Sequence, residues 1–570
     1  MVAYARKPTF AELYTPKLAT VLREGYRFPD LKADVVAGLT VAIVALPLSM
    51  AIAIGSGVTP DRGLYTSIVG GFVVSLLGGS RFQIGGPAGA FNVLVAATAQ
   101  KFGVDGLFTA AFMAGLILLL IGFLRLGQFI KYIPFPVTVG FTSGIAVIIF
   151  ASQVKELLGL RLRGPEPGPF LPKVAALAEA LPTASWGPVA VAVLTILAIV
   201  TVRRFRPHWP AFLIGVAVAS VLSALLHLPV DTVGSRFGGI PRTLPVPHLP
   251  DLSPARVLEL LPSAVSFALL GGIESLLSAV VADSMSGRRH RSNVELVAQG
   301  AANMASAVFG GICVTGTIAR TATNVRTGAR GPVAGMLHAL FVLLFMVAAA
   351  PLASYIPLSA LAAVLAVVCW NMAEKHEFAV LLRASRGDAA VLLVTFLLVV
   401  FRDLTQGILI GFALGALLFL HRMAQSVEVV RPPRIEDDRA DGTEGDPTTH
   451  YDAKAASDAE VVVYHISGAF FFGSAAAVGA ALEEIGERPK AYVIDVSAVP
   501  LIDSTAAATI AGFARRAHRH GVAVHVAGAR PAVREILAIH GAQPPVVRFE
   551  DTVEDASAAA HGHAPLAPAA

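Results

Sequence analysis

The chain has 570 residues, of which 55% are hydrophobic and only 15% are charged, and its mean hydropathy is +0.68. Soluble domains carry about 25% charged residues, so this composition excludes an ordinary soluble protein and indicates a chain that crosses a membrane many times. The two cysteines lie in apolar runs, which excludes a disulfide framework or a CxxC metal pattern, and the net charge of +5 identifies no partner by itself.

Apolar stretches fill the chain from residue 34 to residue 423, mostly with short loops between them. Twelve of them approach the roughly 20 residues that a helix needs to cross a bilayer. Residues 1–33 are mixed and basic and lack the pattern of a cleaved signal peptide, so we predict a cytosolic segment there, followed by a transmembrane domain at 34–423. The twelve predicted spans are 34–54, 62–79, 106–126, 134–153, 187–203, 209–227, 262–286, 293–310, 332–352, 356–373, 387–401 and 404–422.

Two further apolar stretches, 87–100 and 317–327, are too short for a full crossing. Each follows a glycine-rich run, "GGSRFQIGGPAGAF" (78–91) and "FGGICVTGTIARTA" (309–322). Counted as half-helices, they give fourteen elements in two sets of seven, with the short element third in each set. Interrupted segments at matching positions in two halves point to a transporter binding site. The alternative interpretation is a loop that enters the protein only to pack.

Basic residues in the short loops indicate the orientation of the chain. Arg125, Arg203, Arg383 and the run "GRRHR" (287–291) fall in loops on one side of the predicted spans, whereas most loops on the other side have almost no lysine or arginine. We therefore predict that both termini lie in the cytoplasm, under a bacterial-type inner membrane. Because "GRRHR" directly follows a span, it indicates topology rather than nucleic-acid binding.

The character of the chain changes after residue 423. Residues 424–458 are rich in acids, prolines and glycines, which predicts a flexible cytosolic linker. From 459 to 555, β-branched runs such as "VVVYHIS" (461–467) alternate with helical stretches, which predicts a small α/β domain. Residues 556–570, "ASAAAHGHAPLAPAA", are low in complexity and predict a disordered tail.

A half-helix that starts at mid-membrane presents free backbone N–H groups and the positive end of its dipole. Two such starts facing each other would make a pocket for an anion. Arg320, just inside the second half-helix, adds a formal charge and a forked donor that suits an oxyanion. The glycines at 85, 86, 89 and 316 would let the backbone approach the ligand closely. The sequence therefore predicts a small anion as the substrate.

Several motifs along the chain carry a family resemblance. The runs "GLTVAIVALPLSMAIAIGSGVTPDRGLYTSIVGG" (38–71), "GGPAGA" (85–90) and "TGTIARTATNVRTGA" (315–329) resemble the SulP family of anion transporters, and "VIDVSAVPLIDSTAA" (493–507) resembles a STAS domain. The resemblance implies fourteen transmembrane segments in a 7+7 inverted repeat, with a mobile core domain, a gate domain and a cytosolic STAS domain. It also implies homodimers and an anion site between the third and tenth segments.

The family's site residues carry over position by position onto this sequence. The acid on the eighth segment matches Glu274, and the residue one turn later matches Ser278; both would serve the coupling ion. Sodium-coupled bicarbonate members have an aspartate at the position of Glu274, a hydroxyl at that of Ala88 and no arginine at that of Arg320, so these departures argue against sodium coupling. The residues that match the anion site are Ser49 on the first segment, Ala88 and Gly89 on the third, and Thr317, Ile318, Ala319 and Arg320 on the tenth.

Glu274 lies near the middle of an apolar run, where an ionised carboxylate costs several kcal/mol unless it has a partner or a function. Gly271, Ser278 and Ala282 share its helix face, which we expect to line the protein interior beside the anion site. Three roles remain open: a proton carrier, a cation ligand together with Ser278, or a structural partner that neutralises Arg320. If an incoming anion displaces Glu274 from Arg320, anion binding and proton uptake would be coupled.

Other polar residues have simpler interpretations. We expect His338 to be a hydrogen-bonded packing histidine and Asn303 to be an interhelical hydrogen-bonding residue. Ser504 lies where related stand-alone STAS proteins are phosphorylated, although a helix N-cap is an equally good interpretation. The sequence contains no phosphate-binding GxxxxGK[ST] motif, no catalytic triad and no metal cluster. We therefore predict that the protein is neither an enzyme nor an ATP-driven pump and that it uses no cofactor and no metal.

These observations predict a secondary active transporter of a small anion, with sulfate or bicarbonate favoured, coupled to protons and working by an elevator-like movement of the core domain. A C4-dicarboxylate/proton symporter and an uncoupled anion exchanger or channel are the alternatives. A further alternative is a membrane-anchored regulatory protein that recruits a cytosolic partner through its STAS domain.

Overall fold

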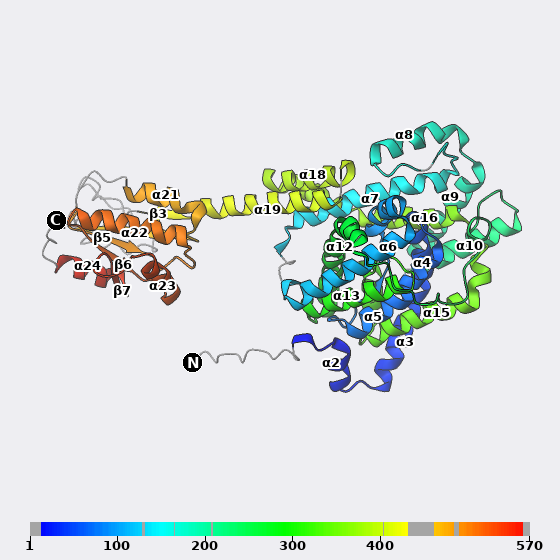
Figure 1. The fold of residues 1–570 in the computed structure, drawn as a ribbon, viewed down its shortest axis with the longest axis horizontal. Helices are drawn as coiled ribbons and strands as arrows, with labels where there is room; N and C mark the ends of the chain where they lie inside the picture. Colours follow the sequence, from blue (N-terminus) through cyan, green and yellow to red (C-terminus); the bar gives the residue numbers. More distant parts are fainter. Residues whose placement is uncertain are drawn as a thin grey trace. The chain divides into compact units, whose positions relative to one another are not determined.

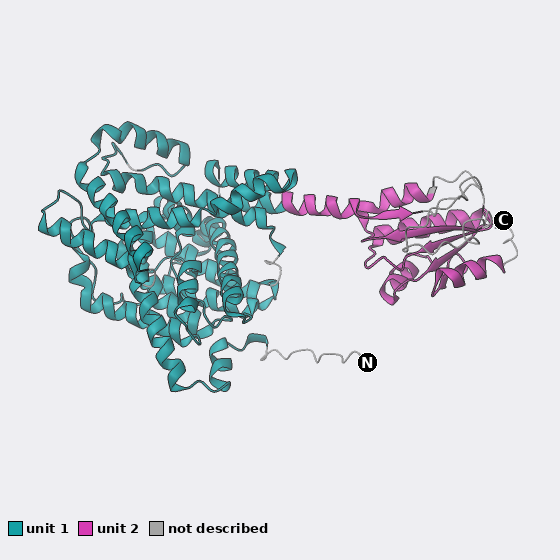
Figure 2. Cartoon of the chain, turned by 180° about the vertical axis from the view of Figure 1, so that it is seen from behind, with its two compact units in different colours: residues 1–413 teal, residues 414–570 magenta. Residues whose placement is uncertain are grey.

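The computed structural model describes residues 13–127, 132–164, 166–206, 209–402, 404–430, 461–483 and 489–562. The chain divides into two compact units, residues 1–413 and 414–570, which are coloured separately in Figure 2. The first unit is helical and the second contains a β-sheet with helices (Figure 1).

Each of the twelve long predicted spans contains a helix. Eight helices of the described residues are long and apolar enough to cross a membrane, whereas the total of fourteen spans remains a prediction. The short helix α2 (Lys17–Arg23) precedes the first span, and other short helices connect some of the spans: α8 (Phe170–Ala180), α11 (Val233–Phe237) and α17 (Lys375–Ala384). The helices at the predicted spans are α3 (Phe28–Gly55), α4 (Pro60–Tyr65) with η1 (Thr66–Gly70) and α5 (Gly71–Leu77), α6 (Asn92–Phe123), α7 (Phe135–Leu158), α9 (Trp186–Phe205), α10 (Ala211–Leu225), α12 (Pro254–Ser286), α13 (Ser292–Val308), α15 (Val333–Ala353), α16 (Leu358–Met372), α18 (Arg386–Phe401) and α19 (Leu404–Gln425).

Both predicted half-helices are present. The first is the N-terminal part of α6, which is preceded by the short helix η2 (Gly89–Phe91) and breaks at Gly103, where φ is 74°. The second is α14 (Ile318–Arg326). A two-stranded antiparallel ladder joins the segments before them, with β1 (Gly85–Gly86) paired to β2 (Thr315–Gly316). The chain therefore brings two segments about 230 residues apart into direct backbone contact.

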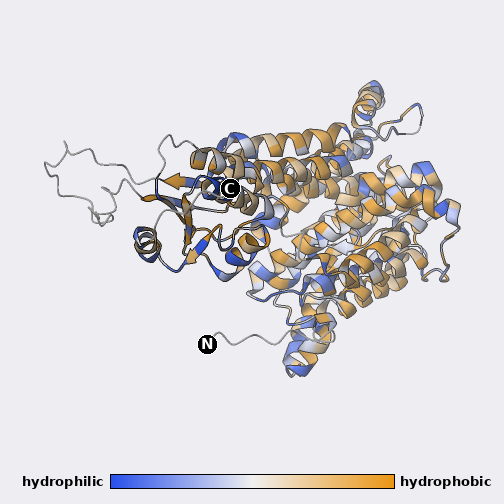
Figure 3. Cartoon of the chain, turned by 60° about the vertical axis from the view of Figure 1, so that its left-hand side comes forward, coloured by the Kyte–Doolittle hydropathy of each residue, from blue (hydrophilic) through white to orange (hydrophobic). Residues whose placement is uncertain are grey.

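The helices of the first unit pack in two groups. One contains α3, α5, α6, α12, α13, α14 and α15, and the other contains α7, α9, α10, α16 and α18. Small residues allow close crossings: a Cβ added to Gly115 of α6 would lie 2.6 Å from the carbonyl oxygen of Gly300 on α13, and the reverse holds as well. Apolar side chains such as Leu120, Leu197 and Leu344 cover the outside, as Figure 3 shows by colour. An apolar outer surface of this kind is typical of helices that face lipid.

The second unit is an α/β domain with a five-stranded sheet in the order β3-β4-β5-β6-β7. The β3–β4 pair is antiparallel and the other pairs are parallel. The β-branched run that predicted this domain forms β4, and valine and isoleucine side chains of β4, β5 and β6 make its core. The strands are β3 (Glu428–Val430), β4 (Val461–Ser467), β5 (Ala491–Asp495), β6 (Ala523–Ala527) and β7 (Arg548–Glu550), and the helices are α21 (Phe472–Glu483), α22 (Ser504–Arg519), α23 (Pro531–Ile539) and α24 (Val553–His561).

Three predicted boundaries need correction. Residues 428–430 of the predicted linker form strand β3, although most of that linker lies outside the described residues. The predicted tail begins inside α24, because Thr552 caps this helix and Ala556 and Ala560, four residues apart, are buried on the sheet. Helix α3 starts at Phe28 rather than near 34, since the Asp30 carboxylate accepts a hydrogen bond from the Arg27 N–H at 3.0 Å.

Candidate functional site

The starts of the two half-helices meet at the β1–β2 ladder. Neither η2 nor α14 has a side chain that caps its N-terminus, so the first backbone N–H groups of each helix have no helical acceptor. The Thr317 N–H and hydroxyl both donate to the Ile84 carbonyl, at 2.9 and 3.0 Å. This ties the start of α14 to the segment before η2. Two positive helix ends are thereby held side by side.

The open part of this junction is formed by Gly89, Ile318 and Ala319. Ala319 is exposed and the other two are partly exposed, whereas Ala88 and Thr317 are buried at 8% and 7% exposure. A Cβ at Gly89 would lie 3.4 Å from Ile149 of α7, so the second helix group packs against the first at this point. Backbone groups, small side chains and the apolar side chain of Ile318 border the place where an anion would lie.

Arg320 lies behind the junction rather than at its opening. The side chain is 1% exposed, and its two terminal nitrogens donate to the hydroxyl oxygens of Ser67, at 3.1 Å, and Ser49, at 3.0 Å. Gly86 leaves room for it, because a Cβ there would lie 2.5 Å from the Nη1 atom. Arg320 and Ser49 therefore supply charge and support from behind β1, and neither side chain is open to solvent in this structure.

A buried polar network positions the segment before the first half-helix. Glu295 of α13 is completely buried and accepts from the backbone N–H groups of Gly79 and Ser80, at 2.8 and 3.0 Å. The Gln83 side chain donates to Glu295 at 2.8 Å and to the Ser275 hydroxyl at 2.8 Å. This network shapes the glycine-rich run between α5 and β1.

The segment before the second half-helix is held in a similar way. The Asn303 side chain donates to the Val314 carbonyl at 2.8 Å and accepts from the Val314 N–H at 2.9 Å, just before β2. Asn303 is thus a hydrogen-bonding residue, as predicted, but it bonds to a loop rather than to another helix.

Glu274 lies at the edge of the predicted polar face of α12. Gly271, Ser278 and Ala282 of this face are buried, while Glu274 is partly exposed. The Ser278 hydroxyl donates to Thr321 of α14 at 3.1 Å, not to Glu274. Among the described residues, the Glu274 carboxylate has no hydrogen bond and no ion pair, including none with Arg320. The predicted pairing of Glu274 with Arg320 is not formed in this structure, because the guanidinium points to α3 and η1.

Some residues of the site were not predicted from the sequence. Ser67 and Gln83 were not recognised, although Ser67 lies in the quoted motif at 38–71 and Gln83 lies in the glycine-rich run at 78–91. Glu295 was not recognised as a member of the site either, and its position in an apolar context was the available signal. His338 was expected to be hydrogen-bonded, yet within the described part of the chain neither ring nitrogen of this fully buried side chain has a partner.

Ser504 is exposed and is the first residue of α22, while the N-cap of this helix is Asp503, whose carboxylate accepts from the Ala506 N–H at 2.9 Å. The N-cap interpretation of Ser504 is therefore wrong, and phosphorylation of its hydroxyl stays a prediction.

Comparison with protein families gives two matches. Residues 31–395 match the sulfate permease family and residues 452–556 match the STAS domain. Among curated proteins, YvdB of Bacillus subtilis, which is described as a candidate sulfate transporter, is 39% identical over 517 residues, covering 90% of this chain and 94% of YvdB. The bicarbonate transporter BicA of Synechocystis sp. is 30% identical over 525 residues, covering 88% of this chain and 89% of BicA.

Two solved structures are similar in fold. The murine Slc26a9 anion transporter in its inward-facing state superposes with a TM-score of 0.83 at 19% identity, covering 99% of this chain and 96% of that one. The transmembrane domain of a cyanobacterial BicA superposes with a TM-score of 0.60 at 28% identity, covering 69% of this chain and 98% of that domain.

Proposed function

Because the chain belongs to the sulfate permease family, we propose that it is a secondary active transporter that moves a small inorganic anion, with sulfate or bicarbonate as the substrate, together with a proton. The observation that carries this proposal is the junction of two uncapped helix starts, joined by β1 and β2 with the Arg320 charge behind them. Backbone N–H groups and helix dipoles would bind the anion, and the buried guanidinium would add attraction without direct contact.

The size of the opening favours a small anion. Gly89, Ile318 and Ala319 border it, and Ile149 of α7 packs close to Gly89. No second basic side chain from the described residues forms a hydrogen bond or an ion pair there, so a second carboxylate of a dicarboxylate would have no partner. The names of YvdB and BicA agree with sulfate and bicarbonate as the anions to test first.

Glu274 is the group that would carry the coupled proton. It is partly exposed on α12, one turn before Ser278, which bonds to Thr321 of α14, and the described residues give its carboxylate no hydrogen-bond or ion-pair partner. A carboxylate held by an ion pair would resist protonation, whereas an unpaired one can bind and release a proton as its surroundings change. This geometry favours the proton-carrier role over a purely structural partnership with Arg320.

The two helix groups would move against each other during transport. The anion junction belongs entirely to the group of α3, α6, α12 and α14, so the site would travel with that group as in an elevator. We further propose an inner-membrane location with both termini in the cytoplasm, a homodimeric assembly, and a STAS domain that binds a cytosolic protein or is phosphorylated at Ser504.

Uptake into proteoliposomes tests the function directly. Labelled sulfate and bicarbonate would be offered with and without an inward proton gradient, for the wild-type protein and for Glu274→Gln. We expect a lower pH outside the proteoliposomes to drive accumulation of one anion by the wild-type protein. Glu274→Gln should abolish this proton-driven accumulation, while downhill exchange of the anion persists. The matched control is Glu259→Gln, at an exposed acid on the same helix that pairs with Arg256, and it should behave as wild type.

Two results would contradict the proposal. Failure to transport either anion would remove the substrate assignment. Transport by Glu274→Gln that still responds fully to the proton gradient would remove Glu274 as the carrier, and flux that ignores every gradient would leave an uncoupled exchanger.

A further inference from the structure

A cavity of about 490 Å³ lies away from the half-helix junction, between the end of α3, the start of α6, and helices α7, α8 and α11. None of the seven predicted anion-site residues lines it. It is bordered by the C-terminal end of α3, so in the proposed orientation it faces the outside of the cell. Among the charged residues that line it, four are basic and two are acidic: Lys155, Lys173, Arg236 and Arg402 against Glu156 and Glu166.

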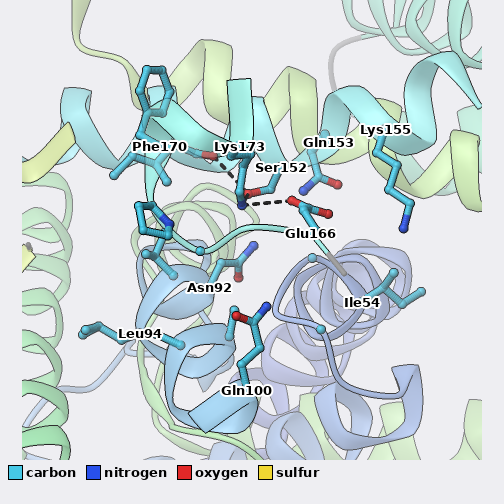
Figure 4. A pocket seen from close by; sticks show the side chains of 18 of the residues that line it. Ile54, Asn92, Leu94, Gln100, Ser152, Gln153, Lys155, Glu166, Phe170 and Lys173 are labelled. Carbon is cyan, nitrogen blue, oxygen red and sulfur yellow. Dashed lines mark hydrogen bonds and ion pairs between the residues drawn. The ribbon is translucent and has the colours of Figure 1, made fainter. Parts of the chain in front are cut away.

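Lys173 is the charged group most deeply placed in this cavity. It is only 8% exposed, and its Nζ atom donates to the Ser152 hydroxyl at 2.8 Å and to the Glu166 carboxylate at 2.9 Å, as Figure 4 shows. A buried ammonium requires an anionic partner. Here that partner is a carboxylate from the loop before α8, which means that the cavity already holds one anionic group at Lys173.

Two amide side chains provide neutral donors beside this pair. Asn92 is 2% exposed, and within the described chain its Nδ2 atom has no hydrogen-bond partner, while its Oδ1 accepts from the Ser56 hydroxyl at 3.0 Å. Gln153 is 4% exposed, and its Nε2 makes a long contact of 3.4 Å to the Ile149 carbonyl. A Cβ at Gly55 would lie 2.9 Å from the Asn92 nitrogen and 3.1 Å from the Gln153 nitrogen, so both amides converge on one spot of the cavity wall.

We propose that this cavity is a second anion site, in which Lys173 supplies the charge, Asn92 and Gln153 supply N–H donors, and the Glu166 carboxylate occupies the place of the incoming anion until it is displaced. An unpartnered buried amide next to a lysine is costly for a protein that never binds a ligand there. A small oxyanion with several acceptor oxygens would satisfy both amides and Lys173 together.

The position of Asn92 connects this second site to the half-helix junction. Asn92 follows Gly89 by three residues, so the two sites are separated by one helical turn at the start of α6. One wall residue of the second site therefore lies about one helical turn from the junction. The inference rests on the proposed function for its direction, because the second site would collect the substrate from the outside before the junction receives it.

Chemical labelling tests binding without requiring transport. Ala97 is an exposed residue in the wall of the cavity, whereas both native cysteines, Cys313 and Cys369, are buried at 1% and 3% exposure. In intact cells that express Ala97→Cys, a membrane-impermeant thiosulfonate added outside should label residue 97. Sulfate or bicarbonate should slow this labelling in a saturable manner, whereas gluconate at equal ionic strength should not.

Changes at the ion pair should have opposite effects on this protection. In the Ala97→Cys background, Lys173→Gln should raise the concentration of sulfate or bicarbonate needed for half-maximal protection by about tenfold, because a buried charged hydrogen bond is lost. Glu166→Gln should lower that concentration several-fold, since the competing carboxylate is neutralised. The matched control is Lys101→Gln, which removes a lysine from the exposed surface near the cavity and should change nothing.

The outcomes separate this inference from the proposed function. Absence of labelling from outside overturns the second site. So does protection that is the same in Ala97→Cys alone and in Ala97→Cys combined with Lys173→Gln or with Glu166→Gln. A misfolded Lys173→Gln protein cannot imitate tighter protection in Glu166→Gln, so that variant keeps the test decisive. Lys173-dependent protection in a protein that fails to transport sulfate or bicarbonate in proteoliposomes would support the second site while contradicting the proposed function.

Discussion

Two glutamates on neighbouring helices of the first unit have opposite surroundings. Glu295 of α13 is completely buried, and its two carboxylate oxygens accept from four donors, on Gly79, Ser80, Gln83 and Gln299, at 2.8–3.2 Å. Glu274 of α12 is partly exposed and, in the described parts of the chain, has no such partner. Both are acids in apolar helices, and the contacts that distinguish them come mainly from distant parts of the chain.

We propose that the first of these acids serves structure and that the second would serve transport. A carboxylate with four donors stabilises one arrangement of the chain and loses much of its stabilisation when any donor moves. A carboxylate without partners contributes little to folding, yet it keeps its capacity to bind a proton or a cation. We expect substitutions at the two positions to separate stability from coupled transport.

The largest expected effect follows from Glu295→Ala. Removal of this carboxylate leaves four donors without an acceptor in a fully buried place, which should destabilise the protein by about 3 kcal/mol or more. The loop between α5 and β1 should lose its shape, and little folded protein should be recovered. Thermal unfolding in detergent, followed by the amount of monodisperse protein, measures this loss.

Thermal unfolding of Glu274→Gln, measured in the same way, tests the contrast between the two glutamates. We expect its unfolding temperature to stay within a few degrees of the wild-type value, since no described interaction is lost. Glu179→Ala, at an exposed acid on α8, is the control for removing a glutamate at the surface. If Glu274→Gln were destabilised as strongly as Glu295→Ala, the division between the two acids would be wrong.

An intermediate effect is expected from Gly86→Ala. The new Cβ would lie 2.5 Å from the Nη1 atom of Arg320, so the guanidinium would have to move and would lose its bond to the Ser67 hydroxyl. Because a flexible side chain can yield, the fold should persist while the rate of anion transport drops about tenfold, as for a loss of about 1.4 kcal/mol. Initial rates of labelled-anion uptake, compared at equal amounts of folded protein, measure the drop.

Gly271→Ala provides the matched control for that change. Its Cβ would lie at ordinary distances from Phe91, at 3.5 Å, and Leu118, at 3.8 Å, and alanine favours a helix. Equal loss of transport in both variants would mean that Gly86 has no special relation to Arg320.

The smallest expected effect concerns an acid outside the membrane. Asp495 of the STAS domain accepts a hydrogen bond from His465 at 2.9 Å, and this bond, aided by the negative charge of Asp495, raises the pKa of His465 above its usual value. The stabilisation is therefore complete below about pH 6.5 and is lost as the pH rises through the raised pKa. Since the His465 side chain is 42% exposed, solvent screening limits it to about 0.5 kcal/mol.

Hydrogen exchange of the β4 and β5 amides in the full-length protein, corrected for intrinsic rates, should show slower opening at pH 6 than at pH 9. Asp495→Asn should remove most of this difference. A pH dependence that survives Asp495→Asn would have to arise from another group.

Much of the fold follows from the sequence because apolar length and glycine placement constrain it strongly. All twelve long stretches contain helices, and both short stretches form half-helices, since no lipid-exposed loop could satisfy their backbone groups. The boundaries of the domains were less predictable. Residues 556–561 look simple in composition, yet Ala556 and Ala560 find a sheet to pack on, and only tertiary structure reveals that surface.

The site was predictable in its backbone and less so in its side chains. The glycine runs correctly indicated where two helix starts would meet. The direction of the Arg320 side chain depends on its hydrogen bonds to Ser67 and Ser49, which lie 253 and 271 residues earlier in the chain. No local sequence pattern could predict these contacts. For the same reason the pairing of Glu274 with Arg320 was a reasonable expectation from charge alone, but the structure does not contain it.

The β1–β2 ladder has a consequence for how such a protein can diversify. Its four residues hold the two helix starts together through main-chain pairing. The groups that those helix starts offer to a ligand are N–H groups, which every amino acid except proline has. Point substitutions can alter the walls around this frame without removing its donors. New anion preferences can therefore arise by small steps in the surrounding side chains, while the capacity to hold some anion is inherited unchanged.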